Sequence, residues 1–248
     1  MSAARSVRAA GGIAAGLVAA GALTGCATTM QEASRLQLNA ARIRTSEVAT
    51  HVRSAGPAVQ VLHVARVTGG GRTAFIVELR NPGRRAVADL PISVGVRAAR
   101  GRRIDVNALS SAEDSYFDAH LPAIAAGGSL TWVYTTSRRL PAHARPFALV
   151  GARPVPPLAP SALVPVIHAR AQLSSGSQLS IALRNLSSVP QYQLQVYAVA
   201  RSGSHYLAAG NLTVAHLGSQ STRTVWLPVV GKPGSAALTV RALPTILN

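Results

Sequence analysis

Hydrophobic and polar residues alternate with different periods along this chain of 248 residues. Residues 9–22 form a nearly unbroken apolar run, which is too short to span a membrane as a mature helix. Residues 30–54 contain no glycine or proline, and their apolar positions recur at helical spacing. This pattern predicts an amphipathic helix that Gly56 and Pro57 stop. Its apolar stripe is shorter than three heptads, which favours a stalk or a helix packed on the next domain over a coiled coil.

From residue 59 onward the apolar residues recur at every second position, and the runs are rich in β-branched side chains. Runs at 59–67, 74–79 and 92–98 are followed by Gly69-Gly70-Gly71, by Asn81-Pro82-Gly83 and by an arginine-rich turn at 100–103. This spacing is typical of a β-sandwich. The three glycines, followed by Arg72, are predicted to turn a hairpin, because a phosphate cradle would need a helix N-terminus.

Five short blocks of the first half return in the same order in the second half, which indicates a duplicated domain. The matched pairs are Val61-Leu62-His63 with Val166-Ile167-His168, residues 77–81 with 181–185, 92–96 with 194–198, Ser129-Leu130-Thr131-Trp132 with Arg223-Thr224-Val225-Trp226, and 147–150 with 237–240. The first copy carries an insertion at about 107–124, which holds most of its clustered acids. A proline-rich stretch separates the copies and predicts an extended linker.

The run Leu79-Arg80-Asn81-Pro82-Gly83, set between two alternating strands, resembles the strand-Asn-turn-strand pattern of bacterial immunoglobulin-like and fibronectin-type-III-like domains. The resemblance covers both copies and implies a β-sandwich architecture without the paired cysteines of antibody domains. Asn81 and Asn185 are expected to be structural, because asparagine bonds the nearby backbone in turns. We therefore expect an all-β chain with two tandem immunoglobulin-like β-sandwich domains, at 57–153 and 163–248, joined by a linker at 154–162.

The N-terminus carries an export signal. Arg5 and Arg8 precede the apolar run, which ends in Leu23-Thr24-Gly25-Cys26. This ending resembles the lipobox of bacterial lipoproteins, which implies cleavage between Gly25 and Cys26 and acylation of Cys26, the only cysteine. Residues 1–25 would then be the signal peptide, and residues 26–56 the lipidated N-terminus with its helix. The alternative is an uncleaved signal anchor with a chance cysteine.

The lipobox interpretation predicts that the chain is exported and anchored to a membrane by lipid, either at the outer face of the cytoplasmic membrane or at the outer membrane. Ala27 follows the lipidated position. By resemblance to lipoprotein sorting in bacteria with two membranes, an aspartate at this position would act as a signal for retention. The alanine is therefore compatible with transport to an outer membrane.

The chain is strongly basic, with 25 lysine and arginine residues against 8 acidic ones and a formal net charge of +17. No carboxylate side chain follows Asp118. Such a charge favours anionic lipid, wall polymer or glycan as a partner, and an exported protein is not expected to bind nucleic acid. The alternative is a compositional bias that only aids solubility. The candidate anion-binding residues lie in predicted turns: Arg84, Arg85, Arg100, Arg102, Arg103, Arg138 and Arg139.

Catalytic chemistry has little support in the sequence. No nucleophile elbow occurs, and the second half lacks the carboxylate that a serine triad requires. Glu113, Asp114 and Asp118 would suit a glycosidase or a calcium loop, but their spacing favours a solvated acidic loop or one paired with arginines. The histidines are scattered, so neither a metal nor a cofactor is expected. Trp132 and Trp226 are expected in the cores, and an outward-facing tryptophan would suit carbohydrate stacking.

These observations predict a non-catalytic, lipid-anchored envelope protein that acts in adhesion, scaffolding or assembly, with the membrane and an envelope protein as partners. The alternative is an accessory protein that binds an anionic glycan, wall polymer or lipid through the arginine-rich loops.

Overall fold

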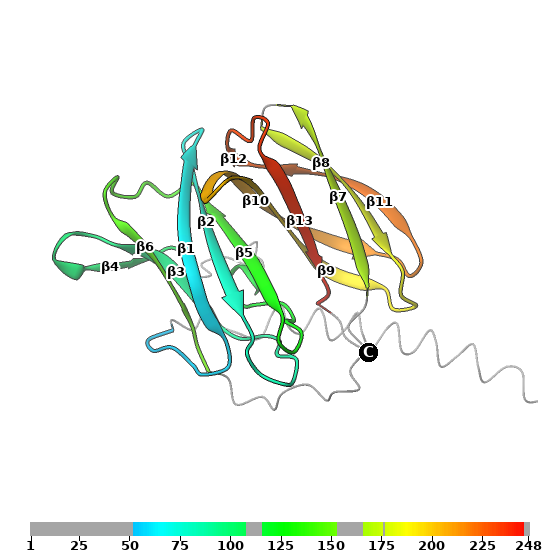
Figure 1. The fold of residues 1–248 in the computed structure, drawn as a ribbon, viewed down its shortest axis with the longest axis horizontal. Helices are drawn as coiled ribbons and strands as arrows, with labels where there is room; N and C mark the ends of the chain where they lie inside the picture. Colours follow the sequence, from blue (N-terminus) through cyan, green and yellow to red (C-terminus); the bar gives the residue numbers. More distant parts are fainter. Residues whose placement is uncertain (1–51, 108–115, 153–165, 176, 246–248) are drawn as a thin grey trace, which may run out of the picture.

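The computed structural model describes residues 52–107, 116–152, 166–175 and 177–245, which are nearly all β-strand (Figure 1). The predicted N-terminal helix, the lipobox and the predicted linker lie outside these ranges. Within the described ranges there is no α-helix, and no helix is long and apolar enough to cross a membrane. The strands are β1 Gln60–Gly69, β2 Arg72–Arg80, β3 Ile92–Arg97, β4 Arg103–Asp105, β5 Ser129–Thr136, β6 Arg145–Val150, β7 Ile167–Ser175, β8 Gln178–Asn185, β9 Gln191–Ser202, β10 His205–Leu217, β11 Thr222–Pro228, β12 Val230–Gly231 and β13 Ala237–Leu243.

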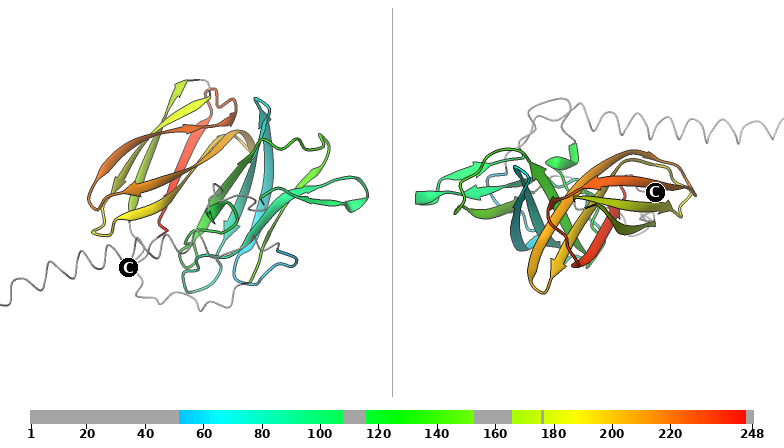
Figure 2. Two further views of the ribbon diagram at one scale, coloured as in Figure 1. Left: turned by 180° about the vertical axis from the view of Figure 1, so that it is seen from behind. Right: turned by 90° about the horizontal axis from the view of Figure 1, so that it is seen from above.

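The strands form four antiparallel sheets, with the orders β4-β3-β6, β1-β2-β5, β12-β10-β9-β13 and β11-β8-β7. The first two sheets come from the N-terminal half and the last two from the C-terminal half, and the halves lie side by side in all views (Figures 1 and 2). In each half the first strand also contacts the last strand of the opposite sheet, β1 with β6 and β7 with β13. Both halves therefore share one pairing scheme.

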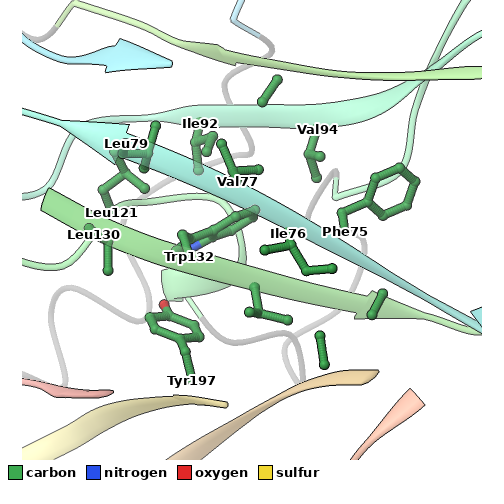
Figure 3. Packing of buried hydrophobic residues seen from close by; sticks show 14 of the residues in the cluster. Phe75, Ile76, Val77, Leu79, Ile92, Val94, Leu121, Leu130, Trp132 and Tyr197 are labelled. Atoms are coloured by element: carbon green, nitrogen blue, oxygen red, sulfur yellow. The ribbon is translucent and has the colours of Figure 1, made fainter. Parts of the chain in front are cut away.

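The four sheets are stacked as layers, because the two inner sheets also contact each other. Strand β10 packs against β1, β2 and β5 of the N-terminal half. Strand β2 is consequently buried on both faces, and Ala74, Phe75, Ile76 and Val77 have no exposed surface. Figure 3 shows Phe75 and Val77 on the side of β3. The matching strand β8 belongs to an outer sheet, and its burial alternates from residue to residue.

Strand β9 has the same two-sided burial in the other inner sheet. Val196 and Ala198 belong to the C-terminal core, whereas their neighbours Tyr197 and Val199 belong to the core shared with the N-terminal half. A strand has side chains on alternate faces, so β9 contributes one face to each core. The hydrophobic contact between the halves is thus continuous with the N-terminal core.

Asn81 and Asn185 have the structural role expected from the sequence, and they have equivalent bonds. Asn81 Nδ2 donates to the carbonyl oxygens of Arg85 at 2.8 Å and Ala125 at 3.0 Å, and its Oδ1 accepts from the Gly83 amide at 2.9 Å. In the second half, Asn185 Nδ2 donates to Val189 and Gly218 oxygens, both at 2.9 Å, and its Oδ1 accepts from the Ser187 amide at 3.0 Å. Each buried asparagine therefore fastens the turn after the second strand of its half to the loop before the fourth matched block.

The expectation that both tryptophans lie in cores is wrong for Trp226. Trp132 is fully buried, but Trp226 is 56% exposed. Trp132 pairs with Val77, whereas the residue opposite Ile181, the counterpart of Val77, is Val225. The sequence alignment of the two blocks is therefore one residue out of register, and one residue turns a strand side chain to the other face of its sheet.

The cross-strand partners also differ between His63 and His168, which the sequence alignment makes equivalent. His63 lies opposite Glu78, whereas His168 lies opposite Arg184. The duplicated order of strands is present, but these two histidines do not share a place in it.

The glycine run forms the hairpin expected from the sequence. Gly69 pairs with Arg72, and Gly70 and Gly71 form the two-residue turn with φ angles of 57° and 74°. Two consecutive positive φ values characterise the type I′ turn that suits the twist of adjacent strands, and glycine adopts them without strain.

Candidate binding surfaces

The arginines predicted to bind anions divide between two ends of the N-terminal half. Arg100 and Arg102 lie in the β3–β4 connection, and Arg138 and Arg139 lie in the β5–β6 connection. The β5–β6 connection contacts strand β4, which follows the β3–β4 connection, because the Arg138 guanidinium donates to the carbonyl oxygen of Asp105 at the end of β4 at 2.9 Å. Two neighbouring strand residues that the sequence reasoning did not select join them. We call this set the arginine-rich end: Arg97, Arg100, Arg102, Arg103, Arg138, Arg139 and Arg145.

Arg84 and Arg85 do not belong to this end. They follow β2, whose last residue pairs with the first residue of β5, whereas Arg138 and Arg139 follow the last residue of β5. The length of a nine-residue strand, roughly 30 Å, therefore separates the two groups. Arg84 and Arg85 therefore do not share a patch with the other candidate arginines, because the connections leave opposite ends of one sheet.

Three arginines of the arginine-rich end occupy opposite positions on neighbouring strands. Arg97 of β3 lies directly opposite Arg103 of β4 on one side and Arg145 of β6 on the other. Like charges placed directly opposite each other destabilise a sheet by a few tenths to about 1 kcal/mol per pair. The Phe147 ring offsets part of this, because the Arg103 and Arg97 guanidiniums lie 4.7 and 5.3 Å from its centroid.

One carboxylate partly neutralises this end. Asp105 Oδ1 lies 2.6 Å from the Arg103 guanidinium, which also donates to the Val52 carbonyl oxygen at 2.8 Å. Arg97, Arg100, Arg102, Arg138, Arg139 and Arg145 are exposed. The described part of the chain therefore begins, at Val52, directly beside a surface of concentrated positive charge.

Arg84 and Arg85 adjoin a small surface depression of about 470 Å³ next to Asn81. The Arg85 carbonyl oxygen is held by the Asn81 side chain. The backbone of this turn therefore has a structural role, while the two guanidiniums are exposed.

The exposed Trp226 lies on the outer face of the sheet β11-β8-β7. Its neighbour across β8 is Ser180, and Gln172 of β7 completes the row. Because Ser180 and the adjacent outward residue Ala182 are small, little covers the ring, which is 56% exposed. This face is open, in contrast to both faces of β2.

The acidic residues predicted for the 107–124 insertion have different outcomes. Glu113 and Asp114 lie outside the described residues. Asp118 ends a short 3-10 turn whose Tyr116 and Phe117 are buried, and its Oδ1 lies 3.4 Å from Asn211 Nδ2 of the C-terminal half. The expectation of a solvated loop is therefore wrong for Tyr116 and Phe117, because their buried aromatic rings draw this turn into the protein.

Asp118 belongs to a polar contact between the halves. Asn211 also accepts a bond from Thr135 Oγ1 at 2.9 Å. Nearby, Trp132 Nε1 and Tyr197 Oη are buried without hydrogen-bond partners among the described residues, and Figure 3 shows the Tyr197 hydroxyl pointing toward Trp132. Burial, and then the charge of Asp118, raises the pKa of Tyr197 well above 10.0, and the Trp132 indole opposes this rise.

A second polar contact joins β2 to the β9–β10 hairpin. The Glu78 carboxylate accepts a hydrogen bond from the Tyr206 hydroxyl and lies 3.6 Å from the Arg201 guanidinium. Burial, followed by the hydrogen bond to Glu78, raises the pKa of Tyr206 to about 12. His63 stacks beside Tyr206 with ring centroids 6.4 Å apart. These groups lie at the junction of the two inner sheets, so their role is to hold the halves together.

No model of a known protein family matches the chain, and no curated protein sequence is significantly similar to it.

No group of three or more histidine, cysteine, aspartate or glutamate side chains that could hold a metal ion occurs in the described part of the chain. Gly25 and Cys26 lie outside it, so lipidation stays a prediction from the sequence. Sequence reasoning missed Arg97 and Arg145 because they lie inside strands instead of turns. Arg97 was detectable in principle as a charge at the end of an apolar run, but its pairing with Arg103 and Arg145 follows only from the register.

Proposed function

We propose that this chain is a non-catalytic, lipid-anchored protein of the cell envelope that binds an anionic polymer or lipid surface through the arginine-rich end. The observation that carries the proposal is the row Arg103, Arg97 and Arg145 on adjacent strands. Like charges opposite each other on neighbouring strands destabilise the folded protein. An anionic partner that neutralises the three arginines would explain why they occupy these positions. Guanidinium groups suit this partner because they bind phosphate and carboxylate oxygens in a bidentate manner.

The proposed anchor brings this end toward an anionic surface. Cys26 would carry the lipid, and the described chain begins at Val52, whose carbonyl oxygen is bound by Arg103. The tether would therefore reach the body beside the arginine-rich end. In this proposal the protein is exported and held at the outer face of the cytoplasmic membrane or at the outer membrane, where each arginine near an anionic surface contributes about 1 kcal/mol.

We further propose that the halves are two immunoglobulin-like β-sandwich domains, 57–153 and 163–248, that arose by duplication. Support comes from the shared pairing scheme and from the equivalent bonds of Asn81 and Asn185. The resemblance of the strand-Asn-turn-strand pattern to bacterial immunoglobulin-like domains agrees with this assignment.

The binding proposal is tested with two variants that lose the same charge at opposite ends of the N-terminal half. The first is Arg100→Gln/Arg102→Gln/Arg145→Gln, and its matched control changes three exposed arginines elsewhere: Arg80→Gln/Arg84→Gln/Arg85→Gln. Both are made in the chain from residue 26 with Cys26→Ser, and cosedimentation is measured with phosphatidylcholine vesicles with and without phosphatidylglycerol. We expect the first variant to lose roughly a hundredfold in affinity for the anionic vesicles, and the control much less.

Salt separates electrostatic binding from other contacts in the same assay. The screening length falls from about 10 Å at 0.1 M to about 3 Å at 1 M ionic strength, so binding by the parent chain should disappear at high salt. Equal losses in the two triple variants would show that only net charge matters and would overturn the assignment to the arginine-rich end.

A second candidate function, assembly with an envelope protein, is favoured by the exposed Trp226. Tryptophan is enriched among the residues that dominate protein interfaces, and this ring stands on an open sheet face. Crosslinking in intact cells, followed by purification through the lipid anchor, would identify a partner. A protein retained at high salt by the parent chain and lost with Trp226→Ala supports assembly. Retention of the partner by both chains would exclude the face around Trp226 as its binding site. The Cys26→Ser variant shows whether the lipid anchor is required for this assembly.

A further inference from the structure

A groove of about 1010 Å³ lies between the two halves, and none of its lining residues belongs to the arginine-rich end. Its walls come from the β1–β2 turn, the start of β8, and the segments on either side of β12, which gather at the top of Figure 1. Part of the lining is apolar, with Leu173, Leu207, Pro228 and Val229. Two cationic residues, Arg72 and Lys232, also line it, and no residue of the lining is acidic.

Glycines keep the groove open by allowing two backbones to meet at its floor. A Cβ atom on Gly69 would lie 2.8 Å from the Gly231 nitrogen, and one on Gly231 would lie 2.2 Å from the Leu207 carbonyl oxygen. Gly231 also has a φ of 95°, which other residues rarely adopt. The turn glycines Gly70 and Gly71 carry no side chain that would fill the space above.

The chemistry of the lining is divided between apolar area and positive charge. Leu173 and Leu207 are 44% and 40% exposed, although both line this concave surface. The Arg72 guanidinium uses one nitrogen to reach Thr135 Oγ1 at 3.0 Å, which leaves its other donors available. Among the described residues the Lys232 ammonium has no ion-pair partner.

We propose that this groove binds a single-chain lipid with an anionic headgroup. The acyl chain lies along Leu173, Leu207, Pro228 and Val229, and the phosphate or carboxylate contacts Arg72 and Lys232. The volume suits a ligand of this size, because small-molecule sites occupy roughly 300 to 1,000 Å³ and combine mostly apolar walls with a few polar groups. A cationic headgroup would be repelled by Arg72 and Lys232, and the lining holds no acid to attract it.

Lys232 makes the proposal directly testable, because it is the only lysine in the chain. Its ε-amine is modified with a limited amount of acetic anhydride, and the modified peptide is measured by mass spectrometry. The protein is the chain from residue 26 with Cys26→Ser. The probes are dodecyl phosphate below its micelle concentration, dodecanol, and methyl phosphate. We expect dodecyl phosphate to protect Lys232 saturably, and the two partial ligands to protect it at least tenfold less well at equal concentration.

Matched variants locate the binding by titration calorimetry with dodecyl phosphate. Arg72→Gln/Lys232→Gln should weaken binding by roughly tenfold or more, whereas Arg170→Gln/Arg241→Gln removes the same charge from exposed strand positions and should change it little. Leu207→Gln should weaken binding several-fold, and Leu62→Gln, which alters a leucine 56% exposed elsewhere, should not.

Any of four results would overturn the proposal. The first is that dodecyl phosphate does not protect Lys232. The second is that methyl phosphate protects Lys232 equally well, which would indicate a simple anion site. Binding that survives in Arg72→Gln/Lys232→Gln would place the lipid elsewhere. Stronger protection by an acidic peptide than by dodecyl phosphate would identify a protein partner instead. Protection of Lys232 reports on the groove separately from the arginine-rich end, because Lys232 lines the groove and does not belong to that end.

Discussion

At the scale of single residues, the two tryptophans give the sharpest contrast. Trp132 has no exposed surface and packs in the N-terminal core, whereas Trp226 is 56% exposed. Trp132→Ala should lower the free energy of unfolding by about 3 to 5 kcal/mol, because it leaves a cavity in a packed core. Trp226→Ala should change it by less than about 1 kcal/mol. Urea unfolding followed by far-ultraviolet circular dichroism measures both, and similar losses in the two variants would contradict the register described for β11.

Tyr206 provides a prediction about alkaline pH. Its pKa is raised to about 12, first by burial and then by its hydrogen bond to Glu78. A tyrosine with a folded-state pKa above the unfolded value near 10 favours folding fully below pH 10. This stabilisation is lost as the pH rises from about 10 to about 12. Spectrophotometric titration of phenolate absorbance should show one fewer group ionising near pH 12 in Tyr206→Phe.

A control variant assigns the cause of that shift. Glu78→Gln removes the negative charge but preserves the size of the side chain, so the pKa of Tyr206 should fall toward its ordinary value. Difference spectra against Glu78→Gln/Tyr206→Phe isolate this tyrosine from the other four. A Tyr206 pKa unchanged by Glu78→Gln would mean that burial alone holds the proton.

Some residue roles are predictable from sequence and others are not. Asn81 and Asn185 follow a strand and precede a turn, and that local chemistry is sufficient to assign them. The exposure of Trp226 depends on pairing with β8, which lies more than forty positions earlier in the chain. A similarity of short blocks cannot resolve a shift of one residue, although that shift decides which face of the sheet the ring occupies.

At the scale of strands, uninterrupted apolar runs mark the two inner sheets. Ala74-Phe75-Ile76-Val77 has no polar residue, whereas the matching part of β8 reads Gln178-Leu179-Ser180-Ile181. A run without polar residues is the signature of a strand buried on both faces. The sequence thus contained the signal that β2 is covered twice. The prediction of strands with alternating apolar and polar residues fits β8, but it does not describe this uninterrupted apolar run in β2.

An exchange of residues between these strands tests that interpretation. Ile76 precedes Val77 as Ser180 precedes Ile181, but Ile76 has no exposed surface. Ile76→Ser should destabilise the protein by about 3 kcal/mol, because it removes apolar contact with the C-terminal half. Ser180→Ile should change the free energy of unfolding by less than about 1 kcal/mol, because its face is open. Guanidinium unfolding midpoints measure both, and a tolerated Ile76→Ser would contradict the packing of one inner sheet on the other.

At the scale of the whole molecule, sequence predicts the class but not the stacking. An all-β chain with a repeated order of strands follows from periodicity and turn residues alone. The contact between inner sheets depends on side chains from β2, β5, β9 and β10, together with the inserted turn at Asp118. None of the five matched blocks covers β10, which has thirteen residues where its counterpart β4 has three.

The shared core predicts that the halves unfold as one unit. The N-terminal core includes Tyr197, Val199 and Ala209 from the C-terminal half, so neither half keeps its buried surface alone. In a Trp226→Phe background the fluorescence of Trp132 reports on the N-terminal half, while far-ultraviolet circular dichroism reports on all strands. Coincident urea transitions are expected from the two signals.

A mutation in the far core makes this prediction decisive. Leu194 belongs to the C-terminal core and lies outside the cluster that contains Trp132. Leu194→Ala should cost about 2 to 5 kcal/mol and should move the Trp132 fluorescence midpoint by the same amount as the circular dichroism midpoint. Glu78→Gln/Thr135→Ala removes polar contacts between the halves without opening either core, and it should begin to separate the two signals. If Leu194→Ala leaves the Trp132 midpoint in place, the halves fold independently. The arginine-rich end would then be carried by a separate N-terminal domain, and the groove beside Gly231 would change shape as the halves move.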